Sequence, residues 1–385
     1  MMPLAPAARS FEATFPLTLT TPVTTTIDVE TDMWNALEYY SEVEEFGLAV
    51  VQGRLPSRSD HHEIFKSFQA FVRQAKSYYS SAKTLHYRSS SLLYYYAFLN
   101  LVKAFLVLKD PDSIKGQKIM HGLSYNHPST PNKDFSLEAV TVSNSTGAFP
   151  LFYKGVMGRS NSTKGFAFTI VDLLAYCSTI GYQYGLAGLG QTKIIPSLAA
   201  IAMNQPTQEA WTLLAISSFD RVDATQQLKQ QLMNAYEEIA LPAHLAHTVF
   251  GLNAFAYLNQ RFFQTIIPDK FLPSGALNLG EVAGRLTTAL RPYMGISPYD
   301  DGSNFQVVLP LGIGPTETPI SQDIAIYVIM FYLSSLVRYQ PAYLEELLDH
   351  KPAWLIESFV NSTPETFLRI IVSRITNNRL VFRRS

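Results

Sequence analysis

Thiol chemistry is almost absent from this chain of 385 residues, which has a single cysteine, Cys177. One thiol cannot form an intrachain disulfide, and a zinc site would have to rely on histidine and carboxylate ligands. The cysteine content excludes a disulfide-stapled secreted domain and fits a reducing cytoplasm.

Charged residues are also scarce, at 16% of the chain with a net charge of −1, against roughly 25% charged residues in an average soluble protein. No overall field therefore draws the protein to nucleic acid or to an anionic membrane. The chain is instead 47% hydrophobic, with 24 Phe and 21 Tyr. This composition excludes disorder for most of the length and predicts extensive burial, within the fold or against a partner.

Long apolar runs and a secretory leader are missing as well. The longest apolar stretch, Ile324 to Val337, is shorter than the roughly 20 residues that span a bilayer, and it contains Ser334 and Ser335. The first ten residues hold one arginine and no apolar core segment. We therefore expect a cytoplasmic protein with no membrane partner.

The few charges are unevenly distributed. Between Phe11 and Gly53 there are eight acidic residues and no Lys or Arg, whereas the last twenty residues contain five Arg and no acid. This asymmetry predicts an acidic arm and a basic tail that bind different partners, with Arg379, Arg383 and Arg384 contacting a partner or nucleic acid. The alternative is that the two ends contact each other or are simply solvated.

Helical periodicity dominates both ends of the chain. Near the N-terminus it predicts a helix over Thr31 to Phe46 that ends at Gly47, and another after Asp60. The stretch from Ser89 to Lys109 has almost no polar face and predicts a helix surrounded by protein. The C-terminal third predicts helices over Ile320 to Tyr339, Tyr343 to Leu348, Ala353 to Val360 and Phe367 to Ile375, with Pro341, Pro352 and Pro364 at the starts of the last three.

The middle of the chain is mixed. Leu137 to Val142 and Ala148 to Tyr153 read as a hairpin, Trp211 to Phe219 and Phe305 to Leu311 as strands, and Thr225 to Ile239 as a helix. The fold class is therefore α+β and mainly α, with N- and C-terminal helices completing one bundle. We expect an extended arm over 1–30, half of the bundle over 31–125, a mixed α/β region over 126–318, and the closing helices with a basic tail over 319–385.

Sequence motifs for metals, nucleotides and hydrolases are not convincing. Lys193 does not follow a glycine as a P-loop requires, and no Gly-x-Ser-x-Gly elbow exists. His244 and His247 have no adjacent glutamate, and His61 and His62 at a helix start are typical of solvated residues. We expect no metal and no cofactor.

Polar side chains on the two most apolar helices are more informative. Ser89, Tyr96, Asn100 and Lys103 form one stripe, and Asp323, Tyr327, Ser334 and Arg338 form another. A buried Lys103 or Arg338 without a partner would be costly. The two helices are therefore expected to contact each other, so that the stripes either pair or line a ligand pocket.

These residues also carry a family resemblance. Arg88 to Ala104, with Tyr94-Tyr95-Tyr96, Asn100 and Lys103, then His121-Gly122-Leu123, then Ser334-Ser335 to Pro341, resemble the bacterial YaaC-like proteins. The segment from about Glu63 to Leu123 further resembles the HEPN superfamily of helical-bundle proteins. The resemblance implies a HEPN-like bundle in a prokaryotic cytoplasmic protein, with relatives in toxin–antitoxin, CRISPR and anti-phage systems, many of them metal-independent ribonucleases.

The ribonuclease pattern of that superfamily is an Arg followed by four to six residues and a His. It matches this sequence only from Arg54 to His61, and the loop expected there indicates a chance match. Our primary interpretation is an interaction or sensor subunit of a defence or stress complex, with protein partners and no robust catalysis. A polar or ligand cluster would comprise Arg88, Tyr96, Asn100, Lys103 and Ser334. The alternative is a ribonuclease in which His121 is the general acid or base and Arg338 stabilises charge on the phosphate. RNA binding through local basic patches and a homo-oligomer remain open.

Overall fold

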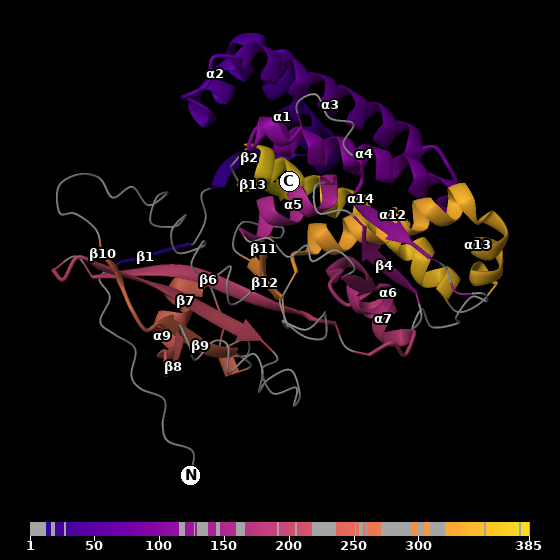
Figure 1. The fold of residues 1–385 in the computed structure, drawn as a ribbon. Helices are drawn as coiled ribbons and strands as arrows, with labels where there is room; N and C mark the ends of the chain where they lie inside the picture. Colours follow the sequence, from indigo (N-terminus) through magenta and orange to yellow (C-terminus); the bar gives the residue numbers. More distant parts are fainter. Residues whose placement is uncertain are drawn as a thin grey trace. The chain divides into compact units, whose positions relative to one another are not determined.

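The chain forms two compact units, each described below by itself (Figure 1). The helical unit comprises Thr26–Thr192 and Gly312–Asn378, and the sheet unit comprises Met1–Thr25, Lys193–Leu311 and Arg379–Arg384. The computed structural model describes residues 13–16, 20–26, 28–114, 120–126, 128, 138–143, 147–158, 166–190, 192–204, 206–217, 236–250, 252–253, 257–258, 260–270, 295–298, 304–308, 320–349, 352–376 and 379–384.

The helical unit confirms a mainly α protein of the α+β class. Its helices are α1 (Val29–Glu42), α2 (Glu44–Arg54), α3 (His61–Lys83), α4 (Tyr87–Val107), η1 (Pro111–Ser113), α5 (Ala148–Met157), α6 (Ile170–Leu174), η2 (Ser178–Ile180), α7 (Gly181–Leu186), α12 (Gln322–Tyr339), α13 (Pro341–Leu348) and α14 (Pro352–Thr376). This unit includes residues 126–192, which the sequence analysis assigned to the middle region.

Helix α4 is the centre of the helical unit, where it packs against α3, α12 and α14. Figure 1 shows the N-terminal helices α3 and α4 beside the C-terminal helices α12 and α14. Phe98 of α4 stacks on Phe367 of α14 with ring centroids 4.0 Å apart, and both side chains are buried. This position explains the apolar residues on every side of α12, since residues 320–336 are all buried, whereas α4 is buried except along a stripe that includes Ser89, Tyr96 and Lys103.

Helices α1 and α2 differ from the predicted single helix that ends at Gly47. The break lies at Val43, whose backbone is extended, and α2 runs through Gly47. A Cβ atom at Gly47 would lie 2.2 Å from a ring carbon of Phe65 in α3. The glycine therefore permits close packing of two helices and does not stop one.

Helix α14 also differs from the prediction, because it is one helix through Pro364. Proline has no N–H for the helical ladder. Side-chain bonds supplement the helix nearby, since the Thr363 hydroxyl donates to the Phe359 carbonyl at 2.7 Å. Burial of Phe359 and Phe367 on either side of the proline holds both halves in one helix.

The predicted hairpin over 137–153 is wrong in its second half. β4 (Ala139–Val142) pairs antiparallel with β3 (Leu123–Tyr125) and β5 (Ala167–Thr169), while the expected partner segment is helix α5. Phe149, Phe152 and Val156 are buried at helical spacing. Gly158, with a φ of +70°, ends α5 in the left-handed conformation.

The sheet unit is built on an eight-stranded sheet of order β11-β12-β6-β7-β9-β8, to which β1 adds on β6 and β10 on β7. The small side chains of Ala200, Ala202 and Ala215 form a core with Ala246 of the helix that packs against β6. Its elements are β1 (Ala13–Pro16), β6 (Ile194–Asn204), β7 (Glu209–Ser217), β8 (Tyr236–Ile239), α9 (Ala243–Phe250), β9 (Gln260–Thr265), β10 (Asp269–Lys270), β11 (Gly295–Pro298) and β12 (Asn304–Val308).

Other predictions for the middle and the ends can now be compared with the structure. The strands predicted at Trp211 and Phe305 are confirmed as β7 and β12. In the predicted helix over 225–239, the last four residues are instead strand β8, and residues 218–235 lie outside the described part. The two ends of the chain do meet, because β13 (Arg379–Arg384) pairs with β2 (Thr20–Thr26).

Candidate functional site

Helices α4 and α12 contact each other, as their polar stripes predicted. Nη1 of Arg338, in the last turn of α12, donates to the Tyr96 hydroxyl of α4 at 2.8 Å. The buried ring of the preceding residue, Tyr95, packs on Phe331 and Tyr327 of α12, with centroids 5.5 and 5.7 Å apart. The polar contact therefore lies at the edge of a dry aromatic interface.

His121 joins this contact from the segment before β3. Its ring lies 5.0 Å from the Phe331 ring, and its Nδ1 accepts a hydrogen bond from the Leu123 N–H at 3.3 Å. Partial burial lowers the pKa of His121, and the positive charge of Arg338 acts in the same direction. At neutral pH the imidazole is therefore uncharged and carries its proton on Nε2, beside a permanent cation.

Asn100 and Lys103 continue the α4 stripe in different ways. The Asn100 side-chain amide donates to the Tyr96 carbonyl one turn earlier, at 2.8 Å, and is buried. The half-buried Lys103 ammonium lies 5.8 Å from the centroid of the Phe71 ring on α3, and burial lowers its pKa. Asn100 is thus satisfied within its helix, whereas Lys103 faces an aromatic ring.

The structure does not bring every predicted residue to the cluster formed by Tyr96, His121 and Arg338. The buried Ser334 hydroxyl donates to the Phe331 carbonyl of its own helix at 2.8 Å. Arg88 pairs with Glu345 of α13 at the surface. Arg379, Arg383 and Arg384 belong to β13, and their side chains lie outside the described part of the structure.

A buried carboxylate that the sequence analysis missed joins β3 to the start of α13. Glu138 is fully buried and accepts hydrogen bonds from the hydroxyls of Tyr125, at 2.5 Å, and Tyr343. Burial raises the pKa of Tyr343 and of Tyr125 above the usual tyrosine range, and the Glu138 carboxylate acts in the same direction. Both phenols therefore stay protonated and continue to donate.

A second missed group is an ion pair in the core. The guanidinium of Arg374 in α14 binds the buried carboxylate of Asp323 in α12 at 2.6 and 3.1 Å. The Ser321 hydroxyl also donates to that carboxylate. This fork geometry ties α12 to α14 and places Asp323, which the sequence put on the α12 stripe, away from the α4 contact.

The motifs set aside from the sequence have structural partners. Arg54 donates to the Ile375 carbonyl at the end of α14, and His61 Nε2 lies 2.8 Å from the Leu55 carbonyl oxygen. Among the described residues, no group of three or more His, Cys, Asp or Glu side chains could hold a metal ion.

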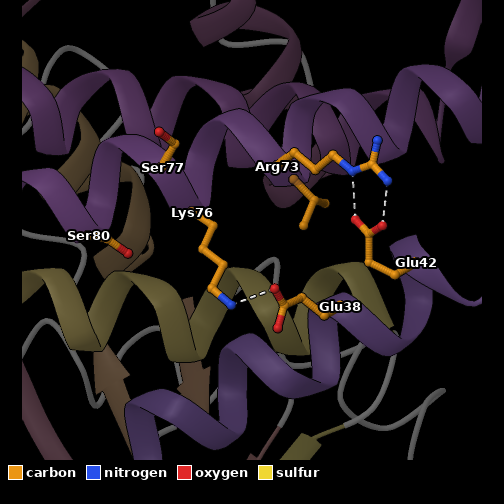
Figure 2. A pocket seen from close by; sticks show the side chains of 7 residues that line it. Glu38, Glu42, Arg73, Lys76, Ser77 and Ser80 are labelled. Carbon is orange, nitrogen blue, oxygen red and sulfur yellow. Dashed lines mark hydrogen bonds and ion pairs between the residues drawn. The ribbon is translucent and has the colours of Figure 1, made fainter.

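The acidic segment faces a basic helix. Glu30, Glu38 and Glu42 of α1 pair with Lys83, Lys76 and Arg73 of α3 at 2.5–2.7 Å. A groove of about 240 Å³ lies between these helices. Figure 2 shows two ion pairs along it, Glu38 with Lys76 and Glu42 with Arg73, and Ser77 and Ser80 farther along α3. Because its charges already neutralise each other, this groove has no spare charge for a ligand.

One helix in the described part of the chain, α4, is long and apolar enough to cross a membrane by length and composition. Of its most apolar window, 72% is buried inside the protein. That burial is typical of a core helix.

The fold and this cluster define a mainly helical α+β protein in which α4, α12 and the segment before β3 bring a tyrosine, an arginine and a neutral histidine together. The family model described as "YaaC-like Protein" matches residues 54–375, and the chain belongs to that family. No curated protein and no solved structure matches the chain.

Proposed function

We propose that this YaaC-like protein is an interaction or sensor subunit of a cytoplasmic bacterial defence or stress-response complex, without robust catalysis of its own. The observation that carries the proposal is the surface next to the cluster. Tyr339 and Met120 directly adjoin Arg338 and His121 in the sequence, and both are exposed large apolar side chains. Tyr, Met and Arg are the residue types enriched at protein interfaces.

The internal bonding of the polar stripes supports a subunit over an enzyme. Tyr96, Asn100 and Ser334 form hydrogen bonds within α4 and α12 or between them. These hydrogen bonds hold the bundle together. The union of N- and C-terminal helices around α4 supports the further proposal of a HEPN-like bundle.

Complex formation tests the subunit proposal. The tagged protein would be co-expressed with the products of the genes adjacent to its own, and assemblies would be measured by size-exclusion chromatography with light scattering. Tyr339→Ala should weaken the complex, whereas Tyr182→Ala, which removes a similarly exposed tyrosine of α7, should not. Absence of any complex, or equal loss with both variants, would count against the proposal.

A ribonuclease is the second candidate, and the neutral His121 beside the Arg338 cation is the observation that favours it. In such a site the Leu123 N–H would have to release Nδ1 of His121, which would then take the proton of a ribose 2′-hydroxyl. The 2′-oxygen would attack the adjacent phosphate, the departing 5′-oxygen would take a proton from water, and Arg338 would stabilise the phosphorane charge. Purified protein should then cleave RNA in EDTA, and His121→Ala should abolish cleavage without changing the thermal melt. The subunit proposal instead predicts intact RNA under all these conditions.

A further inference from the structure

Most of the described cations of the helical unit are neutralised by nearby carboxylates. Arg58, Lys66, Arg73, Lys76, Lys83 and Arg88 each pair with an aspartate or glutamate. Among the described residues, no carboxylate pairs with either of two half-buried cations, Lys103 and Arg338.

Both of these cations lie against aromatic rings on one face. Lys103 faces Phe71, and the Arg338 guanidinium lies 4.3 Å from the Tyr339 centroid. Between them, the Tyr78 and Tyr96 rings lie 5.4 Å apart. Because Tyr96 and Lys103 are two turns apart on α4, they lie about 10 Å apart along its axis. We call this face the aromatic seam: Phe71, Tyr78, Tyr96, Lys103, Arg338 and Tyr339.

We propose that the aromatic seam binds an acidic segment of a protein partner, with carboxylates at Lys103 and Arg338 and an apolar side chain between them on the tyrosine rings. The inference rests on the proposed subunit function and names the chemistry of the partner. A half-buried cation attracts an anion more strongly than a fully solvated one, because less water screens the pair. Tyr and Arg are also enriched among the few residues that supply most of the binding energy at protein interfaces.

The charge of the seam favours an acidic protein segment over a nucleic acid. Affinity for nucleic acid grows with the number of phosphates that Lys and Arg neutralise. The seam has two cations, and the whole chain has a net charge of −1. Two charges suffice for two carboxylates of a peptide but neutralise only a small part of a nucleic-acid strand.

Fluorescence anisotropy with the full chain tests the inference. The probes are fluorescein-labelled peptides in which two glutamates flank a tyrosine at increasing separations, matched peptides with glutamine in place of glutamate, and a short single-stranded oligouridylate. Binding should be tightest at one separation of the glutamates and weaker at shorter and longer ones, because both carboxylates must reach Lys103 and Arg338 at once. It should weaken by about tenfold or more with glutamine, as expected for loss of a charged hydrogen bond.

Lys103→Glu should weaken binding of the best glutamate peptide at least as much as glutamine does. The matched control is Lys154→Glu, which reverses the charge of an exposed lysine on α5 and should leave binding unchanged. Circular dichroism melts would verify that both variants are folded.

Three outcomes would overturn the inference: no glutamate peptide binds, glutamine peptides bind equally well, or the two lysine variants behave alike. Binding of oligouridylate but not peptide, with loss in Lys103→Glu, would assign the seam to nucleic acid instead. A complex with neighbouring gene products that withstands Lys103→Glu would refute the seam and leave the subunit function standing. Lys103-dependent peptide binding without any such complex would support the aromatic seam and contradict the subunit function.

Discussion

The buried ion pair between Asp323 and Arg374 allows a sharp test of what holds the helical unit together. The Asp323 side chain is 0% exposed and that of Arg374 13% exposed, and two hydrogen bonds join them. Arg374→Ala would leave a buried carboxylate with the Ser321 hydroxyl as its remaining described donor. Removing one partner of a buried pair costs about 3–5 kcal/mol, since the other charge stays desolvated.

A surface pair of the same geometry provides the control. Arg73 also binds a carboxylate, that of Glu42, through two hydrogen bonds at 2.9 and 2.6 Å, but these side chains are 60% and 37% exposed. Water can solvate Glu42 after Arg73→Ala, so this variant should change stability little. Burial is thus the variable that differs between the two substitutions.

Urea and thermal unfolding, both followed by far-UV circular dichroism, report the helical unit and measure both variants. At about 2–4 °C per kcal/mol for a unit of this size, Arg374→Ala should lower the Tm by roughly 6–20 °C. The double variant Asp323→Leu/Arg374→Met should recover most of the loss, because it removes both charges. Equal stability of Arg374→Ala and Arg73→Ala, or no recovery in the double variant, would refute the reasoning.

Three further predictions concern packing, pH and the tyrosine-bound carboxylate. Gly47→Ala should destabilise the protein by about 1–3 kcal/mol in urea, because its Cβ would collide with Phe65. Gly53→Ala, in the same helix with open space around it, should be neutral or stabilising; the reverse order would show that α2 is not packed as described. The lowered pKa of His121 means that the unfolded chain binds a proton more readily, so stability should fall as pH drops below about 6.5. His121→Gln should reduce that acid-induced loss, and an NMR titration midpoint of His121 above the ordinary histidine value would contradict the assignment. Glu138→Gln should lower stability by about 1–3 kcal/mol, because a charged acceptor of two tyrosine hydroxyls becomes neutral; an unchanged urea midpoint would argue against it.

Local sequence patterns were sufficient for the two central helices, α4 and α12. Apolar residues all round α4 and α12 predicted their burial, and the polar residues on them predicted their mutual contact, because a buried polar group needs a partner. Short segments were less predictable. The same apolar run near Phe149 fits a strand or a helix, and the helix was decided by packing of its side chains in the core.

The position of a break in a helix depended on contacts that no local pattern contains. Gly47 and Pro364 are both typical of helix boundaries, yet both lie inside helices. At Gly47 the ring of Phe65 in α3 packs so closely that a side chain would not fit, and around Pro364 the buried residues of α14 keep the helix continuous.

The sequence by itself therefore determined the mainly helical class, the buried central helices and their pairing, since hydrophobic periodicity and the cost of burying polar groups act within each segment. Only the tertiary structure decided which polar groups meet. The Glu138 carboxylate and Tyr343 are 205 residues apart, and Arg338 and Tyr96 are 242 apart. Hydrogen-bond partners at such separations are chosen by how whole helices pack, which is a property of the assembled core and not of either segment.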